Sequence, residues 1–300
     1  MPEAPATSSL TQRLRAVTGR HNALLKDLRS VYAKGVLTDE GCYAIEGVRL
    51  MEEAIRSGVK FRAVFFSDSA TGVVDRLLQQ VGHKVEVLLV PAKLFKEAVT
   101  SEAPQGVAAL VYAKESSLED ALSSSQPPLL VVAAGLQDPG NLGTILRSAE
   151  AFGAGGVLLG EGTVSVYNPK TVRATAGSIF RLPTIPLKLA DAIPRLREHG
   201  IRLFATSSHK GTPLDQVQLG GPTAFFIGNE GAGLPRDLEP LMDEFIAIPQ
   251  AKTVESLNAG IAASIVLYEA ARQRRSSSTT EGTGQVKSSR TRVSAPHERL

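Results

Sequence analysis

The sequence predicts an α/β protein built from two domains, and three observations support this fold class. Expected helices and strands alternate along residues 21–113 and again along residues 128–274, and each block is long enough to bury a core. Residues 114–127 between them are rich in serine and proline, which is typical of a linker. In the second block, residues 129–134 form an apolar run that suits a parallel strand covered on both faces.

The first block predicts a small α/β sandwich. Its clearest helix covers residues 48–58, where Leu50, Ala54 and Ile55 recur at helical spacing and Gly58 marks the end. The other expected helices and strands complete the alternation. In chain order they are a helix at 22–33, strands at 43–47 and 61–67, a helix at 72–82, a strand at 84–90, a helix at 92–100 and a strand at 106–112.

The second block predicts a larger sheet with a long closing helix over residues 256–275, whose last turn is basic, as the helix dipole favours. Gly153, Gly155 and Gly156 lie after a helix and before a strand, the reverse of a dinucleotide-binding loop, so we assign them no nucleotide. The remaining expected elements follow the strand at 129–134. They are a turn-rich segment at 135–143, a helix at 144–153, strands at 155–160, 201–206, 223–228 and 244–249, and a loop with a short helix at 168–178.

The two ends of the chain are expected to be disordered arms. Residues 1–20 and 275–300 are rich in Ser, Thr and Arg and lack apolar periodicity. Both ends are basic, whereas the middle of the chain carries more acidic than basic side chains. Basic ends on an acidic body suggest arms for a polyanion such as RNA, with solubilising tails as the alternative.

Composition excludes several classes of protein. No run of 18 or more apolar residues occurs and the start of the chain lacks the apolar core of a signal peptide, so we expect no membrane span and a cytoplasmic location. Cys42 is the single cysteine, which excludes an internal disulfide and a cysteine-rich zinc site. The 5 histidines are scattered, with no pair at metal-ligand spacing, so we expect no metal.

The loop "FFIGNEGAGLP" at residues 225–235 is built for close backbone approach to a ligand. A phosphate loop would need Lys-Ser or Lys-Thr after its last glycine, but Leu234 and Pro235 follow Gly233. Glu230 would also repel an anion, and Arg236 occupies the third glycine position of a dinucleotide fingerprint. The sequence therefore favours a ligand that is not an anion.

Three segments that contain glycine or serine begin at residues 136, 225 and 246. Each of them follows or includes the end of an expected strand. Ligands of parallel α/β sheets bind beyond the carboxyl ends of the strands. The three segments are therefore expected to converge on one site, although this placement does not name the ligand.

These segments resemble the three motifs of the SpoU (TrmH-type) RNA ribose 2′-O-methyltransferases, a family with a knotted α/β fold. Gln250 replaces the methionine that usually follows the proline of the third motif. Residues 22–113 resemble the family's N-terminal substrate-binding domain more loosely. The motif residues in chain order are Asn141, Gly143 and Arg147, then Gly228, Glu230 and Gly233, then Ile248, Pro249, Ser256, Leu257 and Asn258.

The resemblance implies a trefoil knot (SPOUT class) in the C-terminal α/β domain, preceded by a smaller L30e-like α/β domain. It also implies S-adenosylmethionine as cofactor. A sulfonium cation tolerates the nearby Glu230 carboxylate, so this cofactor agrees with a ligand that is not an anion. Thr206, Gly228, Ile248 and Leu257 would line the cofactor pocket. The family further implies a homodimer, and the N-terminal domain favours large-subunit (23S-type) ribosomal RNA as substrate.

The resemblance also assigns catalytic candidates. The family gives the residue matching Arg147 the task of managing the ribose proton, but an arginine stays charged in proteins, so we expect it to clamp the phosphate and hydroxyl and to stabilise the alkoxide. Asn141, Glu230, Ser256 and Asn258 would position Arg147, the ribose and the loops. Taken singly, Asn141 and Ser256 are also plausible helix caps and Arg147 a solvated helix charge.

Two other functions remain open from the sequence. One is a tRNA ribose 2′-O-methyltransferase, and the other is a non-catalytic RNA-binding protein of ribosome assembly. A binding protein has no need of the full catalytic set, so the intact motifs favour the enzyme. The sequence does not name the modified nucleotide, its base, or whether naked RNA or an assembling particle is the substrate.

Overall fold

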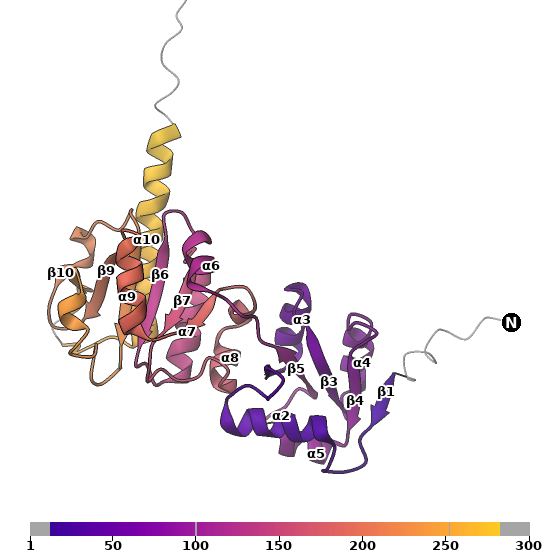
Figure 1. Cartoon of the computed structure of the whole chain (residues 1–300). Coiled ribbons are helices and arrows are strands. Elements are labelled where there is room, and N and C mark those ends of the chain that lie inside the picture. Colours follow the sequence, from indigo (N-terminus) through magenta and orange to yellow (C-terminus); the bar gives the residue numbers. More distant parts are fainter. Residues whose placement is uncertain (1–12, 100, 252, 283–300) are drawn as a thin grey trace, which may run out of the picture.

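The structure, a computed structural model, describes residues 13–99, 101–251 and 253–282 and contains two α/β domains that lie side by side (Figure 1). The N-terminal domain contains a five-stranded sheet of order β1-β4-β3-β5-β2. Strands β1, β4 and β3 are parallel, and β5 pairs antiparallel with both β3 and β2. Its elements are β1 (Leu14–Ala16), α2 (Ala23–Lys34), β2 (Cys42–Glu46), α3 (Val48–Arg56), β3 (Phe61–Ser67), α4 (Thr71–Leu78), β4 (Glu86–Val90), α5 (Ala92–Ala98) and β5 (Val107–Tyr112).

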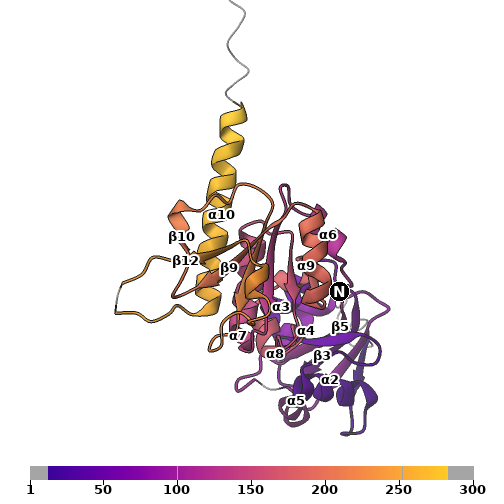
Figure 2. The same cartoon turned by 60° about the vertical axis from the view of Figure 1, so that its left-hand side comes forward.

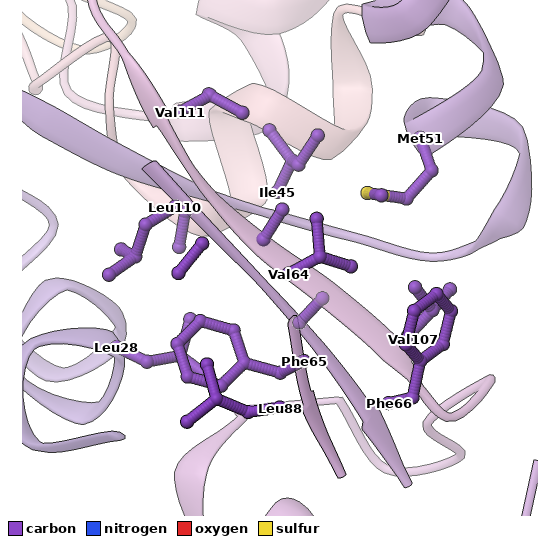
Figure 3. Close-up of a cluster of buried hydrophobic side chains, with 14 of the residues drawn as sticks. Leu28, Ile45, Met51, Val64, Phe65, Phe66, Leu88, Val107, Leu110 and Val111 are labelled. Carbon is purple, nitrogen blue, oxygen red and sulfur yellow. The ribbon is translucent and has the colours of Figure 1, made fainter. Parts of the chain in front are cut away.

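Every helix and strand expected in the first block is present, and the apolar side chains that predicted them form the core. Phe65 and Phe66 of β3 point to opposite sides of the sheet and are fully buried. Figure 3 shows Phe65 beside Leu28 of α2, and Phe66 beside Val107 of β5. Helices α2 and α5 lie on one face of this sheet and α3 and α4 on the other (Figure 1).

The expected N-terminal arm is partly wrong, because residues 13–20 belong to the folded domain. Strand β1 pairs with β4, and the Arg13 guanidinium donates to carbonyl oxygens in and after the last turn of α4. Arg15 and Arg20 form salt bridges with glutamates of the same domain. These basic side chains thus serve the fold, and the rest of the predicted arm lies outside the described residues.

The C-terminal domain contains a seven-stranded, fully parallel sheet of order β10-β12-β9-β11-β6-β7-β8. Its elements are α6 (Leu118–Ser123), β6 (Leu129–Ala134), α7 (Pro139–Ala151), β7 (Gly156–Leu159), α8 (Pro169–Ala174), η1 (Ser178–Phe180), β8 (Thr184–Pro186), α9 (Leu189–Glu198), β9 (Arg202–Ser207), β10 (Thr212–Pro213), η2 (Leu214–Gln216), β11 (Thr223–Gly228), η3 (Glu239–Leu241), β12 (Glu244–Ala247) and α10 (Ala259–Gly282).

Strand β6 shows how this sheet is covered on both faces, as its apolar run predicts. Leu129 and Val131 join the core cluster that includes α7 and α10, whereas Leu130 and Val132 join the cluster that includes α6 and α9. The alternation follows from the period of two along a strand. Helix α10 packs against α7 and projects beyond the edge of the sheet in both views (Figures 1 and 2).

Two further expectations differ from the structure. Residues 114–127, expected to be a linker, contain a helix that was not expected, α6, which begins with a capping box between Ser117 and Asp120 and packs on β7. Gly155 and Gly156 make room for that contact, since added Cβ atoms would lie 2.1 Å from the Ala121 carbonyl oxygen and 2.7 Å from the Ala121 Cβ. The disordered tail expected from residue 275 instead begins as helix, because α10 runs to Gly282, and the remainder lies outside the described residues.

The two domains meet at what we call the docking face, residues 167–181 of the C-terminal domain. Val172 and Phe180 are buried within the core cluster of the N-terminal domain. The rings of Tyr43 and Tyr167 lie 5.1 Å apart across the junction, at an interplanar angle of 39°. The domains therefore share apolar core.

Arg181 adds polar contacts at the docking face. Its guanidinium binds Glu53 (3.0 Å) and Ser57 (2.9 Å) on α3 of the N-terminal domain and Glu150 on α7 of the C-terminal domain. Gly177 lies next to this cluster at φ 101°, and an added Cβ would come within 3.0 Å of the Glu53 side chain. The arginine thus connects α7, which carries the first motif, to the neighbouring domain.

Candidate functional site

The C-terminal domain contains a cavity of about 1070 Å³ at the carboxyl ends of β9, β11 and β12. Because these strands are parallel, their ends meet at one edge of the sheet. Three segments form much of its wall, namely 206–210, 227–234, and the third made of 248, 250–251 and 254–259, and we call them the cavity edge. Thr206, Gly228, Ile248 and Leu257, the residues expected at a cofactor, all line this cavity.

The glycine-rich loop after β11 is folded by its own backbone and by Asn229. Asn229 and Gly233 exchange backbone hydrogen bonds of 2.9 and 2.8 Å, which closes the loop. The Asn229 side chain accepts from the N–H groups of Gly231 and Ala232 and donates to the Gly135 carbonyl oxygen. A Cβ at Gly228 would lie 2.3 Å from the Gly233 carbonyl carbon, so only glycine fits there.

A chain of hydrogen bonds joins the three sequence motifs. The Asn141 amide donates to Glu230 Oε1 (3.0 Å), and the Asn258 amide donates to Asn141 Oδ1 (2.7 Å). The backbone N–H groups of Gln137 and Asp138 also donate to Glu230, at 3.3 and 3.2 Å. Asn141 therefore lies between the glycine-rich loop and the start of α10, and it fixes one against the other.

Glu230 is held as a carboxylate at the N-terminus of α7. Partial burial raises the pKa of this carboxyl group, but hydrogen bonds from Asn141 and from backbone N–H groups outweigh that effect, and the net pKa lies below the ordinary value of 4.5. The positive end of a helix dipole also favours a negative charge at this position. Glu230 is thus an acceptor that ties the loop to α7 and not a carboxyl group poised to donate a proton.

The helix-cap alternatives for Asn141 and Ser256 do not hold in the structure. Asp138 caps α7, accepting from the N–H of Asn141 at 2.7 Å. Asn258 accepts from the N–H of Ile261 in the first turn of α10. Ser256 lines the cavity, as do Glu230 and Asn258.

Asn141 is absent from the cavity walls but is hydrogen-bonded to two residues that line them, Glu230 and Asn258. Arg147 is the catalytic candidate that neither lines the cavity nor, among the described residues, bonds to a residue that does. It lies nearly two turns along α7 from Asn141, its side chain is exposed, and it is absent from the cavity walls. Within the part of the chain that the structure describes, no hydrogen bond or salt bridge holds its guanidinium. The side chain is therefore free to contact a molecule that approaches α7 from outside.

Sequence reasoning missed three residues of this site. Asp138 and Asn229 act through short-range hydrogen bonds, and Asx residues next to turns and helix starts could have indicated both. Gln250 lines the cavity with a side-chain oxygen that is buried. Its departure from the usual methionine was the available signal, and the sequence alone gave it no role.

Comparison with known proteins agrees with the geometry. Residues 128–268 match the SpoU rRNA methylase family, and residues 22–109 match the MRM3-like substrate binding domain. An uncharacterized tRNA/rRNA methyltransferase of Synechocystis is 34% identical over 278 residues, which cover 90% of this chain and 98% of that protein. The chain belongs to the SpoU family of RNA methyltransferases.

Other relatives carry more specific names. The 23S rRNA (guanosine(2553)-2′-O)-methyltransferase RlmP of Bacillus subtilis is 29% identical, with 85% of this chain and 98% of that protein covered. The 23S rRNA (uridine(2479)-2′-O)-methyltransferase of Streptomyces viridochromogenes is 32% identical, with 90% and 96% covered. Sequence similarity to these SpoU enzymes thus spans both domains of this chain.

Solved structures confirm the predicted fold class, a trefoil-knot (SPOUT) α/β methyltransferase domain preceded by a smaller α/β domain. An AdoMet-bound rRNA methyltransferase from Sinorhizobium meliloti superposes with a TM-score of 0.76 at 30% identity, covering 87% of this chain and 98% of that one. The AdoMet complex of the SpoU methyltransferase AviRb gives 0.75 at 30% identity, covering 85% and 99%. This SpoU family member is therefore an S-adenosylmethionine-dependent RNA methyltransferase.

The cavity of this SpoU protein fits that cofactor. Ligand pockets are mostly apolar with a few placed polar groups, and here Ile227, Leu234 and Leu257 supply apolar wall. The carboxylate of Glu255 suits a ligand with cationic groups, whereas Glu239 is already paired with Lys210 at 2.6 Å. The Gln250 side-chain oxygen is buried behind this wall without a hydrogen-bond partner among the described residues.

The described residues of this SpoU chain lack two features. None of the helices in its described residues is long and apolar enough to cross a membrane. Nor do those residues contain a group of three or more His, Cys, Asp or Glu side chains arranged to hold a metal ion.

Proposed function

We propose that this protein methylates a ribose 2′-hydroxyl of large-subunit (23S-type) ribosomal RNA. The relatives from Bacillus and Streptomyces are named as 23S rRNA 2′-O-methyltransferases, and their similarity to this chain extends through the N-terminal domain. Their names specify different nucleosides, guanosine and uridine, so we assign no base to the target. A cytoplasmic location accompanies this proposal, since that is where an rRNA of this type is made.

The observation that carries the proposal is the hydrogen-bond chain from Glu230 through Asn141 to Asn258. It ties the glycine-rich loop, the start of α7 and the start of α10 into one unit beside the cavity. A protein that only bound RNA would gain nothing from fixing these three segments around a cofactor pocket. We assign Asn141, Glu230 and Asn258 the role of positioning this unit, and Ser256 a contact with the target ribose.

The chemistry asked of the protein is modest. S-adenosylmethionine supplies an activated methyl group, and the nucleophile is the ribose hydroxyl. Holding reactants in line can contribute about 7–11 kcal/mol to rate acceleration. The residues of the cavity edge would supply that alignment on the cofactor side, and the N-terminal domain would hold the RNA on the other.

Arg147 is assigned to the RNA. An arginine that stays charged cannot accept the hydroxyl proton, but it can bind a phosphate oxygen and stabilise a developing alkoxide. Its exposed, unpaired position on α7 suits a group that meets the substrate only when RNA arrives. In an Arg147→Ala variant we expect unchanged S-adenosylmethionine affinity by calorimetry and turnover lower by about 10²–10³-fold. Full turnover in that variant would remove Arg147 from the mechanism.

We also propose that the protein is a homodimer formed through its C-terminal domain. Ile261 and Tyr268 lie two turns apart on one side of α10 and are 51% and 50% exposed, which is unusual for apolar side chains of this size on a long helix. Light scattering after gel filtration should give twice the 31.8 kDa mass of the chain. A variant with Ile261→Asp and Tyr268→Asp should give the single-chain mass, and a wild-type monomer would overturn the proposal.

The function is tested by methyl transfer from labelled S-adenosylmethionine to separated rRNA, ribosomal subunits and tRNA. We expect label on rRNA or on the large subunit, confined to one nucleotide. Label on tRNA alone would show that the substrate assignment is wrong. The absence of label from every RNA, despite tight cofactor binding, would show that the protein is a binding protein and not an enzyme.

A further inference from the structure

The arginines of this protein divide into those that the fold uses and those that it leaves free. Within residues 13–99, 101–251 and 253–282, most arginine side chains form a salt bridge with a carboxylate or donate to backbone carbonyl oxygens. The exposed arginines that lack both kinds of contact within these ranges are Arg49, Arg147, Arg173 and Arg236.

The positions of the free arginines are more informative than their exposure. Arg236 follows two residues after Leu234, which lines the cavity. Arg147 lies one turn beyond Gly143, where α7 packs closely on α8, since an added Cβ at Gly143 would lie 2.4 Å from the Ala174 Cβ. These two arginines therefore flank the cofactor site on the side of the cavity and on the side of α8.

Arg173 reaches the N-terminal domain from α8, which lies between α7 and that domain (Figure 1). Its neighbour Val172 is buried in the core cluster of the N-terminal domain. Burial raises the pKa of Glu46 at the end of β2, whereas the Ser101 hydroxyl and the Arg173 guanidinium lower it, so Arg173 lies near the end of that strand. Lys170, one turn earlier on α8, is exposed as well.

Arg49 approaches the same junction from the N-terminal domain. It lies in the first turn of α3, three residues after Glu46. Glu53, one turn later on α3, contacts the docking face at Gly177, where an added Cβ would lie 3.0 Å from the glutamate side chain. Arg49 and Arg173 therefore lie on the two sides of the junction, one on each domain.

The carboxylates beside these two arginines are already engaged. Glu53 binds Arg181 at 3.0 Å, and the buried Glu46 accepts from Ser101 at 2.6 Å. The junction thus presents unpaired positive charge on a chain whose middle carries more acidic than basic side chains. Such a distribution attracts a polyanion to this face and repels it from the others.

We propose that the domain junction binds the phosphate backbone of the RNA, with Arg49 and Arg173 each holding one phosphate. Arginine presents a planar fork of donors that matches phosphate oxygens. Among the described residues no carboxylate has to be displaced first. One RNA segment held on both domains has a fixed register relative to the cavity, so Arg49 and Arg173 are positioning residues for the substrate. This inference rests on the proposed action on RNA and adds to it the surface and the side chains that hold the strand.

The test removes both charges in an Arg49→Met/Arg173→Met variant and measures its Kd for deproteinised large-subunit rRNA at several salt concentrations. Each phosphate contact contributes roughly 0.7–0.9 to the slope of log affinity against log salt, so the slope should fall by about 1.4–1.8. At about 0.1 M salt the Kd should rise by about 25- to 60-fold, and the difference should vanish near about 1 M salt. The kcat at saturating rRNA and the affinity for S-adenosylhomocysteine should stay near wild type, because neither arginine lines the cavity.

Two further variants serve as controls. Lys84→Met/Lys188→Met removes one exposed charge from each domain and should leave the Kd and its slope near wild type. Lys84 precedes β4, which β3 and β5 separate from β2, and Lys188 precedes α9, on the opposite face of the sheet from α7. Arg49→Lys/Arg173→Lys keeps both charges and should keep most of the salt slope.

Three outcomes would overturn the proposal. One is an unchanged Kd in Arg49→Met/Arg173→Met, and another is an equal loss in the Lys84→Met/Lys188→Met control. The third is a loss that persists at high salt, which would show that the substitutions disturb the fold and not a contact with phosphate. Failure of the proposed function looks different, because the wild-type protein would then neither bind rRNA in a salt-dependent manner nor methylate it.

Discussion

The cavity edge and the docking face are held together by different forces. Beside the cavity edge, directional hydrogen bonds join the buried side chain of Asn141 to the exposed side chains of Glu230 and Asn258. At the docking face, Val172 and Phe180 are buried in a core shared with the other domain. Hydrogen bonds fix angles as well as distances, whereas apolar packing fixes the relative position of two bodies. We infer that the first region fixes the position of the cofactor and that the second fixes the position of the RNA-binding domain.

Asn141→Ala should cause the largest effect, since it breaks both bonds of the chain that joins the motifs. Loss of the bond to the Glu230 carboxylate and of the bond from Asn258 should lower the free energy of unfolding by about 2–4 kcal/mol. Cofactor affinity should fall with it. Chemical denaturation and calorimetry measure the two effects.

Ser148→Ala is the control for Asn141→Ala, because Ser148 also joins α7 to α10, through a 2.7 Å bond to Ser264. It should cost about 0.5–1.5 kcal/mol of stability and leave cofactor affinity unchanged. If both variants lost cofactor affinity equally, the hydrogen-bond chain would have no special role at the cavity.

Gly228→Ala should have the next largest effect. The new Cβ would lie 2.3–2.4 Å from backbone atoms of Gly233 and Leu234, so the loop must move. A cost of about 1–3 kcal/mol for overpacking corresponds to about 5- to 150-fold weaker cofactor binding. Gly231→Ala in the same loop meets its first neighbour at 3.7 Å and should bind nearly as wild type. Similar losses in the two variants would show that the loop tolerates no methyl group anywhere, whatever its local packing.

Some elements of this fold could be predicted from the sequence and others could not. The apolar runs predicted the central strands because their side chains alone define a buried sheet. Strand β1 was missed because Leu14–Ala16 is only 3 residues long, carries Arg15 at its centre, and is stabilised by pairing with β4, far along the chain. Helix α9 was missed because Pro194 interrupts its pattern, although Leu189, Ile193 and Leu196 still face the core.

The sequence predicted part of the site as well. Motif spacing named Asn141, Glu230 and Asn258, and the structure shows them in contact. Spacing could not show that Arg147 is exposed and absent from the cavity walls, because its place depends on how α7 packs. Nor could it reveal the free acceptor of Gln250, since an unpaired atom is visible only once every neighbour is placed.

Arg181→Met tests the docking face and should act on RNA without acting on the cofactor. The arginine side chain is 42% exposed, so its salt bridges with Glu53 and Glu150 should contribute about 1 kcal/mol or less to stability. We expect KM for rRNA to rise severalfold while kcat and cofactor affinity stay near wild type. Arg272→Met breaks a salt bridge within α10 and should change none of these quantities. A change in cofactor affinity in Arg181→Met would contradict the division between the two regions.

The smallest expected effects are changes of stability with pH. They should differ between the docking face and the cavity edge. Burial raises the pKa of Tyr43, with a further contribution from Tyr167, and burial also raises the pKa of Tyr167. Because the folded state holds these protons more tightly, their contribution is complete at neutral pH and is lost as pH rises beyond about 10. Glu230 behaves oppositely, since its lowered pKa gives stability that is lost only as pH falls below about 4.5.

Tyr167→Phe checks this assignment. The variant should lose less stability than wild type between about pH 9 and pH 11. Denaturant unfolding measures this stability, and the absorbance of ionised tyrosine reports the titration. The chain has no tryptophan and 5 tyrosines, so that absorbance is readily interpreted. An identical alkaline loss in both proteins would show that the docking face is not the region that titrates.

We propose that this protein transfers a methyl group to a ribose hydroxyl of 23S-type rRNA. The most direct measurement is alkaline hydrolysis of rRNA labelled by this protein from methyl-labelled S-adenosylmethionine. Alkali cleaves RNA by attack of the 2′-hydroxyl on the adjacent phosphate, so a 2′-O-methyl group protects its own linkage. Recovery of the label in alkali-resistant dinucleotides from large-subunit rRNA is the predicted result. Recovery of the label in mononucleotides would mean that a base is methylated and would contradict the account.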